Sequence, residues 1–177
     1  LGSSCPSGHP RALHGIRRAS ENREGVLSGR KALTVLYLGT PSRVLEHLRK
    51  TENEVIVRQD PLTDEDPALE ADFLVSFGYR HILPESVLCR FPDRAVNLHI
   101  SLLPWNRGAD PNLWSFLDQT PQGVTVHFMD AGVDTGDIIV QREVRLRSGT
   151  LRTTYEELRT AISDLFIEHW EDIRSGR

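Results

Sequence analysis

The sequence predicts an α/β protein with a Rossmann-like, mostly parallel sheet and flanking helices. From residue 33 onward, short apolar runs alternate with amphipathic stretches, which is the pattern of strands that alternate with helices. Several of the apolar runs are continuous, as expected for strands that are buried on both faces. The length of 177 residues suits one domain with a core of ordinary size.

The first half of this pattern contains three strands. LTVLYLG (33–39) is a continuous apolar run that ends in Gly, and Pro41 is expected to open a helix that reaches about Lys50. EVIVRQD (54–60) and ADFLVSFGY (71–79) are the next two strands, and an acidic loop separates them. The strand–helix–strand order favours parallel pairing of these segments.

The second half adds shorter elements. A short helix from Pro84 leads to the strand RAVNLH (94–99), and residues 111–117 suit another helix. GVTVHFMD (123–130) and GDIIVQREV (136–144) flank the turn AGVDT, which predicts a pair of neighbouring strands.

The chain closes with TTYEELRTAISDLFIEHWEDIR (153–174), which is typical of an amphipathic helix. Its apolar residues at helical spacing are Tyr155, Leu158, Ile162, Leu165, Phe166, Trp170 and Ile173. Thr153 and Glu156 are expected to form a capping box at its start.

Composition and charge limit the function classes. Hydrophobic residues make up 38% and no apolar run approaches membrane-spanning length, so no membrane partner is expected. The net charge of −4 argues against nucleic acid as a partner. Two cysteines give neither a disulfide framework nor a metal spacing, which favours a reducing, cytoplasmic location. Residues 1–31 are Gly-, Ser- and Arg-rich without apolar periodicity, so we expect a disordered leader there.

Three polar residues form the candidate site. Asn97 and His99 share a strand parity, so their side chains face the same way, and Asp134 lies in the turn between the last two strands. Ligands bind at the carboxyl ends of strands in such sheets, so we expect these residues to converge there. Each alone has a structural alternative, namely an Asn that satisfies loop backbone, a structural His and a turn Asp.

Together, such residues suit acyl transfer to an amine. An Asn amide and an imidazolium can donate hydrogen bonds to a developing oxyanion. A His that a carboxylate keeps charged can help to move the proton of the amine. No covalent nucleophile is evident, since Ser101 lacks a G-x-S-x-G elbow.

Other kinds of site compete with this interpretation. His99 and His127 with Asp130 or Asp134 could form a two-His, one-carboxylate metal site. DAGVDTGD lacks the ligand pattern of a calcium loop, and LYLGTPS has one Gly where a dinucleotide fingerprint needs three. We therefore expect no metal and no dinucleotide.

NLHISLLPWNRGAD (97–110), followed by GVDTGDII (132–139), resembles the folate-dependent formyltransferase family. That family includes glycinamide ribonucleotide, methionyl-tRNA and sugar N-formyltransferases. The resemblance implies a formyltransferase catalytic domain over 32–177, with 10-formyltetrahydrofolate as the formyl donor.

The resemblance also implies roles for single residues. Asn97 would polarise the formyl oxygen, His99 would stabilise charge and relay a proton, and Asp134 would orient His99 and its water. The stretch SFGYRHILP (76–84) and the turn 130–134 would form the pterin pocket. The implied folate-binding residues are Phe77, Gly78, Tyr79, His81, Ile82, Leu83, Asp130 and Val133.

The form of the motif narrows the branch. His-Ile-Ser, with WNRGADPNLW after it, is similar to short enzymes that act on amino sugars, so we expect a small amine acceptor on a nucleotide-linked sugar. A tRNA enzyme is expected to carry a further C-terminal domain. The short stretch between the second and third strands leaves the acceptor's identity open, and the oligomeric state stays open, a dimer included. A formyltetrahydrofolate deformylase and a folate-binding remnant without turnover are the alternatives.

Overall fold

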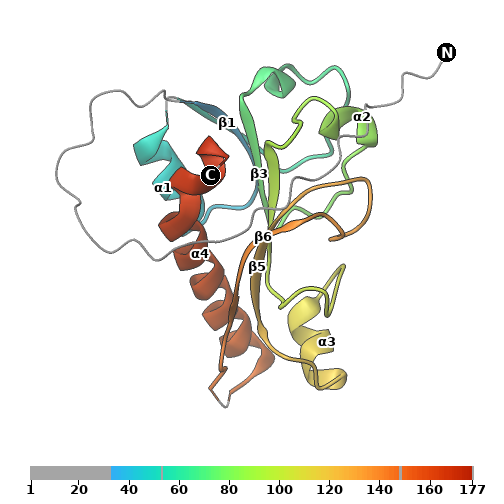
Figure 1. Cartoon of the computed structure of the whole chain (residues 1–177), viewed down its shortest axis with the longest axis vertical. Coiled ribbons are helices and arrows are strands. Elements are labelled where there is room, and N and C mark those ends of the chain that lie inside the picture. The colour runs from blue at the N-terminus through green and yellow to red at the C-terminus, as the bar shows by residue number, and fades with distance from the viewer. Residues whose placement is uncertain (1–32, 53, 148, 177) are drawn as a thin grey trace. The chain divides into compact units, whose positions relative to one another are not determined.

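A computed structural model describes residues 33–52, 54–147 and 149–176, and this part contains a six-stranded sheet (Figure 1). The strand order is β2-β1-β3-β4-β5-β6. The strands are β1 (Thr34–Gly39), β2 (Glu54–Arg58), β3 (Phe73–Phe77), β4 (Ala95–His99), β5 (Gly123–Phe128) and β6 (Ile138–Glu143). Neighbours from β2 to β4 pair in parallel, whereas β5 and β6 are antiparallel to their neighbours. The predicted α/β class and mostly parallel sheet are confirmed, while the expected leader lies outside the described residues.

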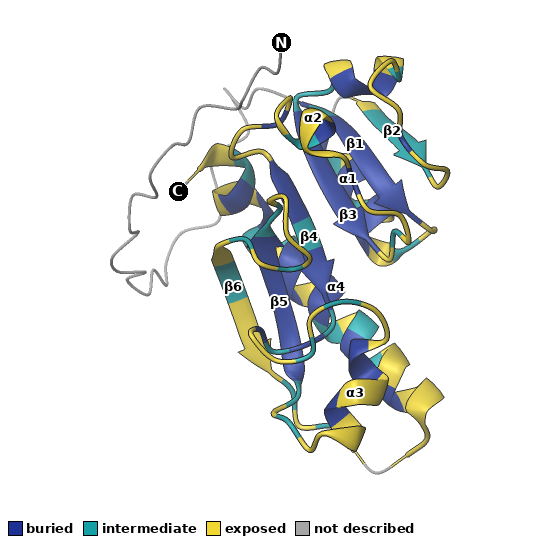
Figure 2. Cartoon of the chain, turned by 90° about the vertical axis from the view of Figure 1, so that its right-hand side faces the viewer, coloured by how far each residue is buried: buried dark blue, intermediate teal, exposed yellow. Residues whose placement is uncertain are grey.

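Helices cover both faces of this sheet. They are α1 (Arg43–Thr51), the 3-10 helix η1 (Pro67–Glu70), α2 (Glu85–Leu88), α3 (Pro111–Leu117) and α4 (Leu151–Ser175). Figure 1 shows α1 and α4 on one face and α2 on the other. The larger core lies between the sheet and the α1–α4 layer, and a smaller core lies against η1 and α2. In Figure 2 the inner strands are buried along most of their length, whereas β6 is largely exposed. No helix in the described ranges is both long and apolar enough to span a membrane.

Two helix starts differ from the sequence-based expectation. The α1 helix begins after Ser42, not at Pro41, because the Ser42 hydroxyl accepts a hydrogen bond from the Leu45 N–H (3.2 Å) and caps the helix. The α4 helix begins before the expected capping box. Thr150 Oγ1 accepts from the Thr153 N–H (3.2 Å) and Thr153 Oγ1 accepts from the Thr150 N–H (2.9 Å), so Thr153 is the second member of the box and not the first.

The buried carboxylate of Glu52 connects distant parts of the fold. Its side chain is fully buried at the end of α1. Oε2 accepts a hydrogen bond from the Leu33 N–H (3.2 Å), and Oε1 accepts from Trp170 Nε1 (2.8 Å) and Arg174 Nη1 (3.0 Å). Glu52 thereby attaches the start of β1 and the end of α4 to α1.

Glu52→Gln should destabilise the protein by about 3 kcal/mol, since it leaves the buried Arg174 guanidinium without its carboxylate. The free energy of unfolding in urea measures this loss. Glu46→Gln, an exposed carboxylate on the same helix, is the matched control and should have little effect. Equal stabilities of the two variants would show that Glu52 does not hold these elements together.

Candidate active site

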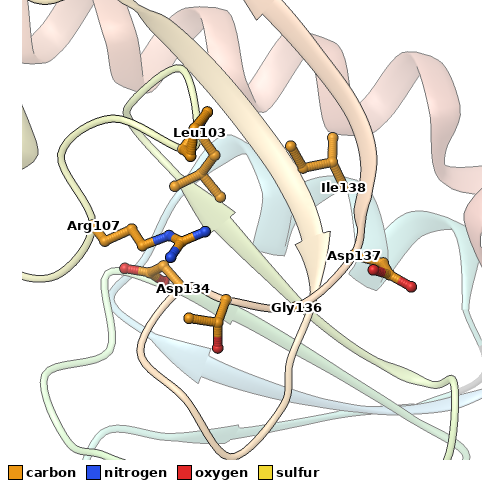
Figure 3. A pocket seen from close by; sticks show the side chains of 8 residues that line it. Leu103, Arg107, Asp134, Gly136, Asp137 and Ile138 are labelled. Carbon is orange, nitrogen blue, oxygen red and sulfur yellow. The ribbon is translucent and has the colours of Figure 1, made fainter.

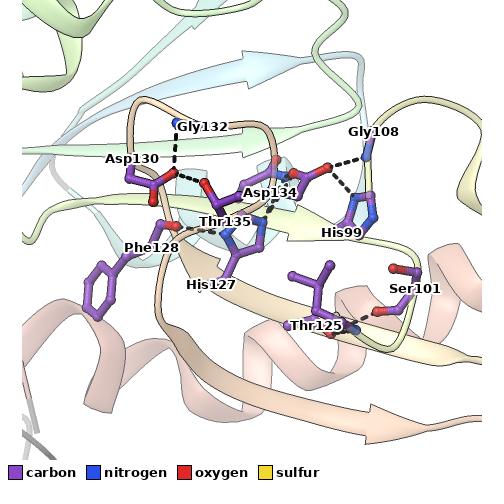
Figure 4. A network of polar contacts seen from close by, with 12 residues as sticks. His99, Ser101, Gly108, Thr125, His127, Phe128, Asp130, Gly132, Asp134 and Thr135 are labelled. Atoms are coloured by element: carbon purple, nitrogen blue, oxygen red, sulfur yellow. Dashed lines mark hydrogen bonds and ion pairs between the residues drawn. The ribbon is translucent and has the colours of Figure 1, made fainter. Parts of the chain in front are cut away.

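The carboxylate of Asp134 is the centre of the candidate site (Figure 4). Oδ1 accepts a hydrogen bond from Asn97 Nδ2 (3.0 Å) and lies 3.4 Å from His127 Nε2. Oδ2 accepts from the Gly108 N–H (2.9 Å) and lies 3.4 Å from His99 Nδ1. The Asp134 side chain is only 12% exposed, so these contacts replace most of its water. The three residues that the sequence singled out are therefore in one cluster.

Asp134 reaches this cluster by an unexpected route. Because β5 runs antiparallel to β4, the loop from Met129 to Asp137 starts beside Ala95, at the first residue of β4. The loop then folds back over the face of the sheet until Asp134 meets the Asn97 side chain. We had expected Asp134 at the carboxyl edge of the sheet, and the reversal of β5 explains why it instead lies over the sheet face.

Backbone conformation also contributes to this approach. Asp134 itself is in the left-handed region, with φ of 52°. This conformation costs about 1 kcal/mol for a residue other than Gly, and it persists here because the four contacts of the carboxylate hold it. Gly136 allows the two arms of the loop to come together, since a Cβ at that position would lie 2.0 Å from the Phe128 carbonyl oxygen.

His99 is held by the loop that follows its own strand. Its Nε2 donates to the Asn106 carbonyl oxygen (2.9 Å), and its side chain is 7% exposed. Asn106 is itself in the left-handed region, and its Oδ1 accepts from Thr120 Oγ1 (2.6 Å). With the proton on Nε2, the free lone pair of neutral His99 is on Nδ1, the atom that faces Asp134.

Burial sets the charge of His99. Burial lowers the pKa of His99; the Asp134 charge and the Asn106 carbonyl raise it in part, and the net pKa is below the ordinary 6.5. His99 is therefore mostly neutral at pH 7. The expectation that Asp134 keeps His99 charged is wrong for the free protein, because desolvation of the imidazolium outweighs the attraction of the carboxylate.

His127 is the second imidazole beside the carboxylate. It lies opposite Asn97 in the β4–β5 pair, and its side chain is 2% exposed. Its Nδ1 donates to the Phe128 carbonyl oxygen (2.7 Å), which turns Nε2 toward Asn97 Nδ2 (3.3 Å) and Asp134. The sequence suggested His127 as a possible metal ligand, with a pocket or face residue as the alternative. In the described ranges, no group of three or more His, Cys, Asp or Glu could hold a metal ion.

Buried hydroxyls support the loop after β4. Thr125 Oγ1 donates to the Ser101 carbonyl oxygen (2.8 Å) and accepts from the Leu103 N–H (3.1 Å). Gln141 Nε2 donates to the Leu103 carbonyl oxygen (3.1 Å), and Ser101 Oγ donates to that of Trp105 (2.8 Å). Ser101 is thus a buried structural hydroxyl, which disfavours a nucleophilic role.

A cavity of about 250 Å³ borders the other side of Asp134 (Figure 3). Its lining residues are Leu103, Pro104, Arg107, Asp134, Thr135, Gly136, Asp137 and Ile138. Figure 3 labels Arg107 and Asp134 among the side chains that line this cavity. This cavity has apolar walls with one cation and two carboxylates, so it suits a small polar group.

The stretch after β3, in which we expected folate-binding residues, has an open surface. Gly78 has φ of 71°, and a Cβ there would meet no protein atom within 4 Å. Ile82 is 82% exposed. Tyr79 fixes the stretch, since its hydroxyl donates to the Asp60 carbonyl oxygen (2.8 Å) and accepts from the Leu62 N–H (3.2 Å).

The other expected folate-binding residues divide into two groups. Phe77 and Leu83 place their side chains in the two cores, so only their backbone is available to a ligand. His81 and Val133 are exposed, as is Asp130. The Asp130 carboxylate accepts hydrogen bonds from its own turn, namely from the Gly132 N–H (3.1 Å) and Thr135 Oγ1 (2.6 Å), and so stabilises the turn.

Comparison with known proteins identifies relatives. The family model described as formyl transferase matches residues 28–169. The formyltransferase PseJ from Anoxybacillus kamchatkensis, solved with UDP-4,6-dideoxy-4-formamido-L-AltNAc and tetrahydrofolate, is 51% identical, with a TM-score of 0.77. The match covers 81% of this chain and 77% of PseJ. A sugar N-formyltransferase candidate from Mycobacterium tuberculosis is 27% identical, with a TM-score of 0.70 over 81% of this chain and 68% of that protein.

Methionyl-tRNA formyltransferases are also among the relatives. Methionyl-tRNA formyltransferase from Listeria welshimeri is 37% identical over 112 residues, which is 62% of this chain and 36% of that protein. The chain thus spans about a third of the length of this curated relative.

The contacts of Asp134 should make stability depend on pH. Burial alone would raise the pKa of Asp134, but the His127 contact, the charge of His99 when acid protonates it and the Gly108 N–H lower it from 3.8 to about 2. A carboxyl whose pKa is lower in the folded state stabilises the protein above pH 3.8, here by about 2 kcal/mol, and this contribution disappears as the pH falls toward 2.

Between about pH 5 and about pH 3, the wild type should lose about 1 kcal/mol more of its free energy of unfolding than Asp134→Asn loses. Urea unfolding of both proteins at each pH measures the difference. Parallel losses in the two proteins would mean that Asp134 does not have the lowered pKa.

Proposed function

The chain belongs to the formyl transferase family, and from this premise we propose that it transfers a formyl group from 10-formyltetrahydrofolate to the amine of a small acceptor. The observation that supports this most directly is the cluster in which Asn97 and His99 both contact the Asp134 carboxylate. An amide donor, a neutral imidazole and a carboxylate are the groups that acyl transfer to an amine requires.

Each of these residues has a separate task in the proposal. The folate supplies the formyl carbon at the oxidation level of the product, so the protein has to manage only charge and protons. Asn97 is half-buried in the middle of β4, and its amide donates to the formyl oxygen as negative charge develops there. In this step Asn97 Nδ2 exchanges its hydrogen bond to Asp134 for one to the substrate.

His99 takes the proton that the amine loses as the new C–N bond forms. The free lone pair of His99 is on Nδ1, and its lowered pKa leaves it neutral and able to accept at pH 7. Protonation creates an imidazolium 3.4 Å from Asp134 Oδ2, where the carboxylate stabilises it. The proton is then available to the departing folate nitrogen, so the protein ends the cycle unchanged.

The open surface after β3 fits the proposed folate. Gly78 leaves room for a flat ring to approach the backbone, and Ile82 and Val133 expose apolar side chains that a pterin could cover. Tyr79, His81 and Asp130 would complete this pocket, together with the backbone of Phe77 and Leu83.

For the acceptor we propose an amino sugar carried on a nucleotide. The likeness to PseJ, which was solved with such a molecule, supports this choice over methionyl-tRNA. An assay with 10-formyltetrahydrofolate as the donor tests this choice of acceptor. It compares three conditions, namely nucleotide-linked amino sugars, methionyl-tRNA and no amine. Formylated sugar is the expected product. Formate release without an amine would favour a deformylase, and folate binding without any turnover would favour a remnant.

His99→Ala should reduce turnover at least a hundredfold, the usual scale for a general acid–base group. In the wild type, kcat/KM should fall only below pH 6.5, because activity requires the neutral imidazole and its pKa is lowered. Steady-state kinetics over a pH series measure both effects. His169→Ala, a variant in the last turns of α4, is the control and should retain turnover; equal activity of the two variants would exclude His99 from the mechanism.

Gly78→Ala should weaken tetrahydrofolate binding about tenfold or more while the melting temperature falls only modestly. The added methyl meets no protein atom, so the only stability cost is that of a left-handed backbone for a residue with a Cβ, about 1 kcal/mol. A ligand pressed against the backbone would clash with this methyl. A thermal melt and a tetrahydrofolate titration separate the two effects. Gly108→Ala is the control. Gly108 has φ of 86° and equally open space, so the substitution has the same kind of backbone cost, but it lies outside the proposed pterin pocket. Unchanged folate affinity in folded Gly78→Ala would place the folate elsewhere.

A further inference from the structure

The guanidinium of Arg159 lies against the ring of Phe77, the last residue of β3. Arg159 projects from α4 and is half-buried. Its Cζ lies 4.7 Å from the centre of the Phe77 ring and 5.8 Å from that of Tyr155, and Nη1 donates to the Tyr155 hydroxyl (3.4 Å). Two aromatic contacts therefore hold a cation in one place.

This cation has no carboxylate partner in the part of the chain that the structure describes. The α4 carboxylates within five residues of Arg159 contact other groups. Glu157 accepts a hydrogen bond from the Arg147 N–H (3.4 Å), Glu156 contacts Arg152 (3.3 Å), and Asp164 contacts Arg43 (2.8 Å). A half-buried guanidinium that aromatic rings hold in place is suited to a phosphate, which it can bind with two parallel N–H donors.

The strand register relates the position of Arg159 to that of the candidate site. Phe77 is the last residue of β3 and pairs with Gly39, while the preceding residue, Ser76, pairs with Asn97. The Phe77 ring packs on the α4 face of the sheet, and the Asn97 amide is on the other face. Arg159, which contacts the Phe77 ring, and the Asn97 amide thus lie on opposite faces of the sheet, against the neighbouring strands β3 and β4.

The charge of Arg159 also acts on the loop after β1. Burial raises the pKa of the Tyr37 phenol, and its hydrogen bond with Ser42 and the positive charge of Arg159 lower it in part. The Tyr37 hydroxyl contacts Ser42 Oγ (2.8 Å) and the Thr40 carbonyl oxygen (3.1 Å). Arg159 thus contacts the last residue of β3, and its charge reaches Tyr37, whose hydroxyl contacts the loop after β1. An acceptor that extends from Asn97 over the carboxyl edge of the sheet would reach this cation.

We propose that Arg159 binds the phosphate groups of the acceptor and so selects nucleotide-linked amines over free ones. This inference rests on the proposed acceptor class. Binding energy from a phosphate far from the amine would hold the amine in position for attack, so the residue would determine specificity without touching the reacting atoms.

The test compares UDP with uridine, which lacks the phosphates, by calorimetric titration of the full chain. In the wild type, UDP should bind at least about tenfold more tightly than uridine. Arg159→Gln should remove most of that difference and leave tetrahydrofolate affinity unchanged, and Arg159→Lys should retain part of it. Arg152→Gln, an 87% exposed arginine on the same helix, is the matched control and should bind UDP like the wild type.

Equal affinities of the wild type for UDP and uridine would overturn the inference without any variant, even if Arg159→Gln failed to fold. An equal loss of UDP binding in Arg159→Gln and Arg152→Gln would also overturn the inference. The same holds if Arg159→Gln loses methionyl-tRNA binding but keeps UDP binding. UDP binding requires no formyl transfer. Absence of formylated product with tight, Arg159-dependent UDP binding would therefore count against the proposed function and not against the role of Arg159.

Discussion

The site depends on a single buried carboxylate that is shared by groups from three segments. Asp134 accepts from an amide on β4 and from the backbone of the loop after β4, and it faces one imidazole on each of β4 and β5. Without that charge, two imidazoles and a half-buried amide would meet in a cavity with no anion to orient them. The fold therefore concentrates its electrostatic specificity in one residue, and the left-handed backbone of Asp134 is the cost of placing it there.

Strand direction determines which residues surround this carboxylate. A parallel β5 would end at the carboxyl edge, and its loop would point away from the sheet face. The antiparallel β5 instead sets His127 across from Asn97 and lets the following loop return over both. The burial that results also lowers the pKa of His99, so the imidazole is ready to accept a proton and becomes an ion pair with Asp134 only when it has done so. In the proposed mechanism, charge separation is thus deferred to the proton transfer.

Local patterns were sufficient to predict the class of fold, the order of its elements and the residues Asn97, His99 and Asp134, because apolar periodicity and turn chemistry are local. Local patterns could not predict the hydrogen bonds of the Asn106 carbonyl and the Gly108 N–H, because these groups belong to the backbone. Their only trace in the sequence is that Asn and Gly tolerate a left-handed conformation. The neutral state of His99 was likewise missed, since it depends on burial, a property of the whole fold. The proposed phosphate-binding role of Arg159 has the same limitation, because Arg159 meets Phe77 only after α4 has packed on the sheet.

The buried Glu52 has a consequence for the order of events during synthesis. Its carboxylate satisfies a donor of Leu33 near one end of the folded unit and donors of Trp170 and Arg174 near the other. A nascent chain that has emerged only as far as β6 carries this carboxylate without two of its donors, next to an apolar sheet face that α4 has yet to cover. The ribosome must therefore release nearly the whole domain before all the donors of Glu52 are in place. Until then, the uncovered apolar face of the sheet is a target for chaperones.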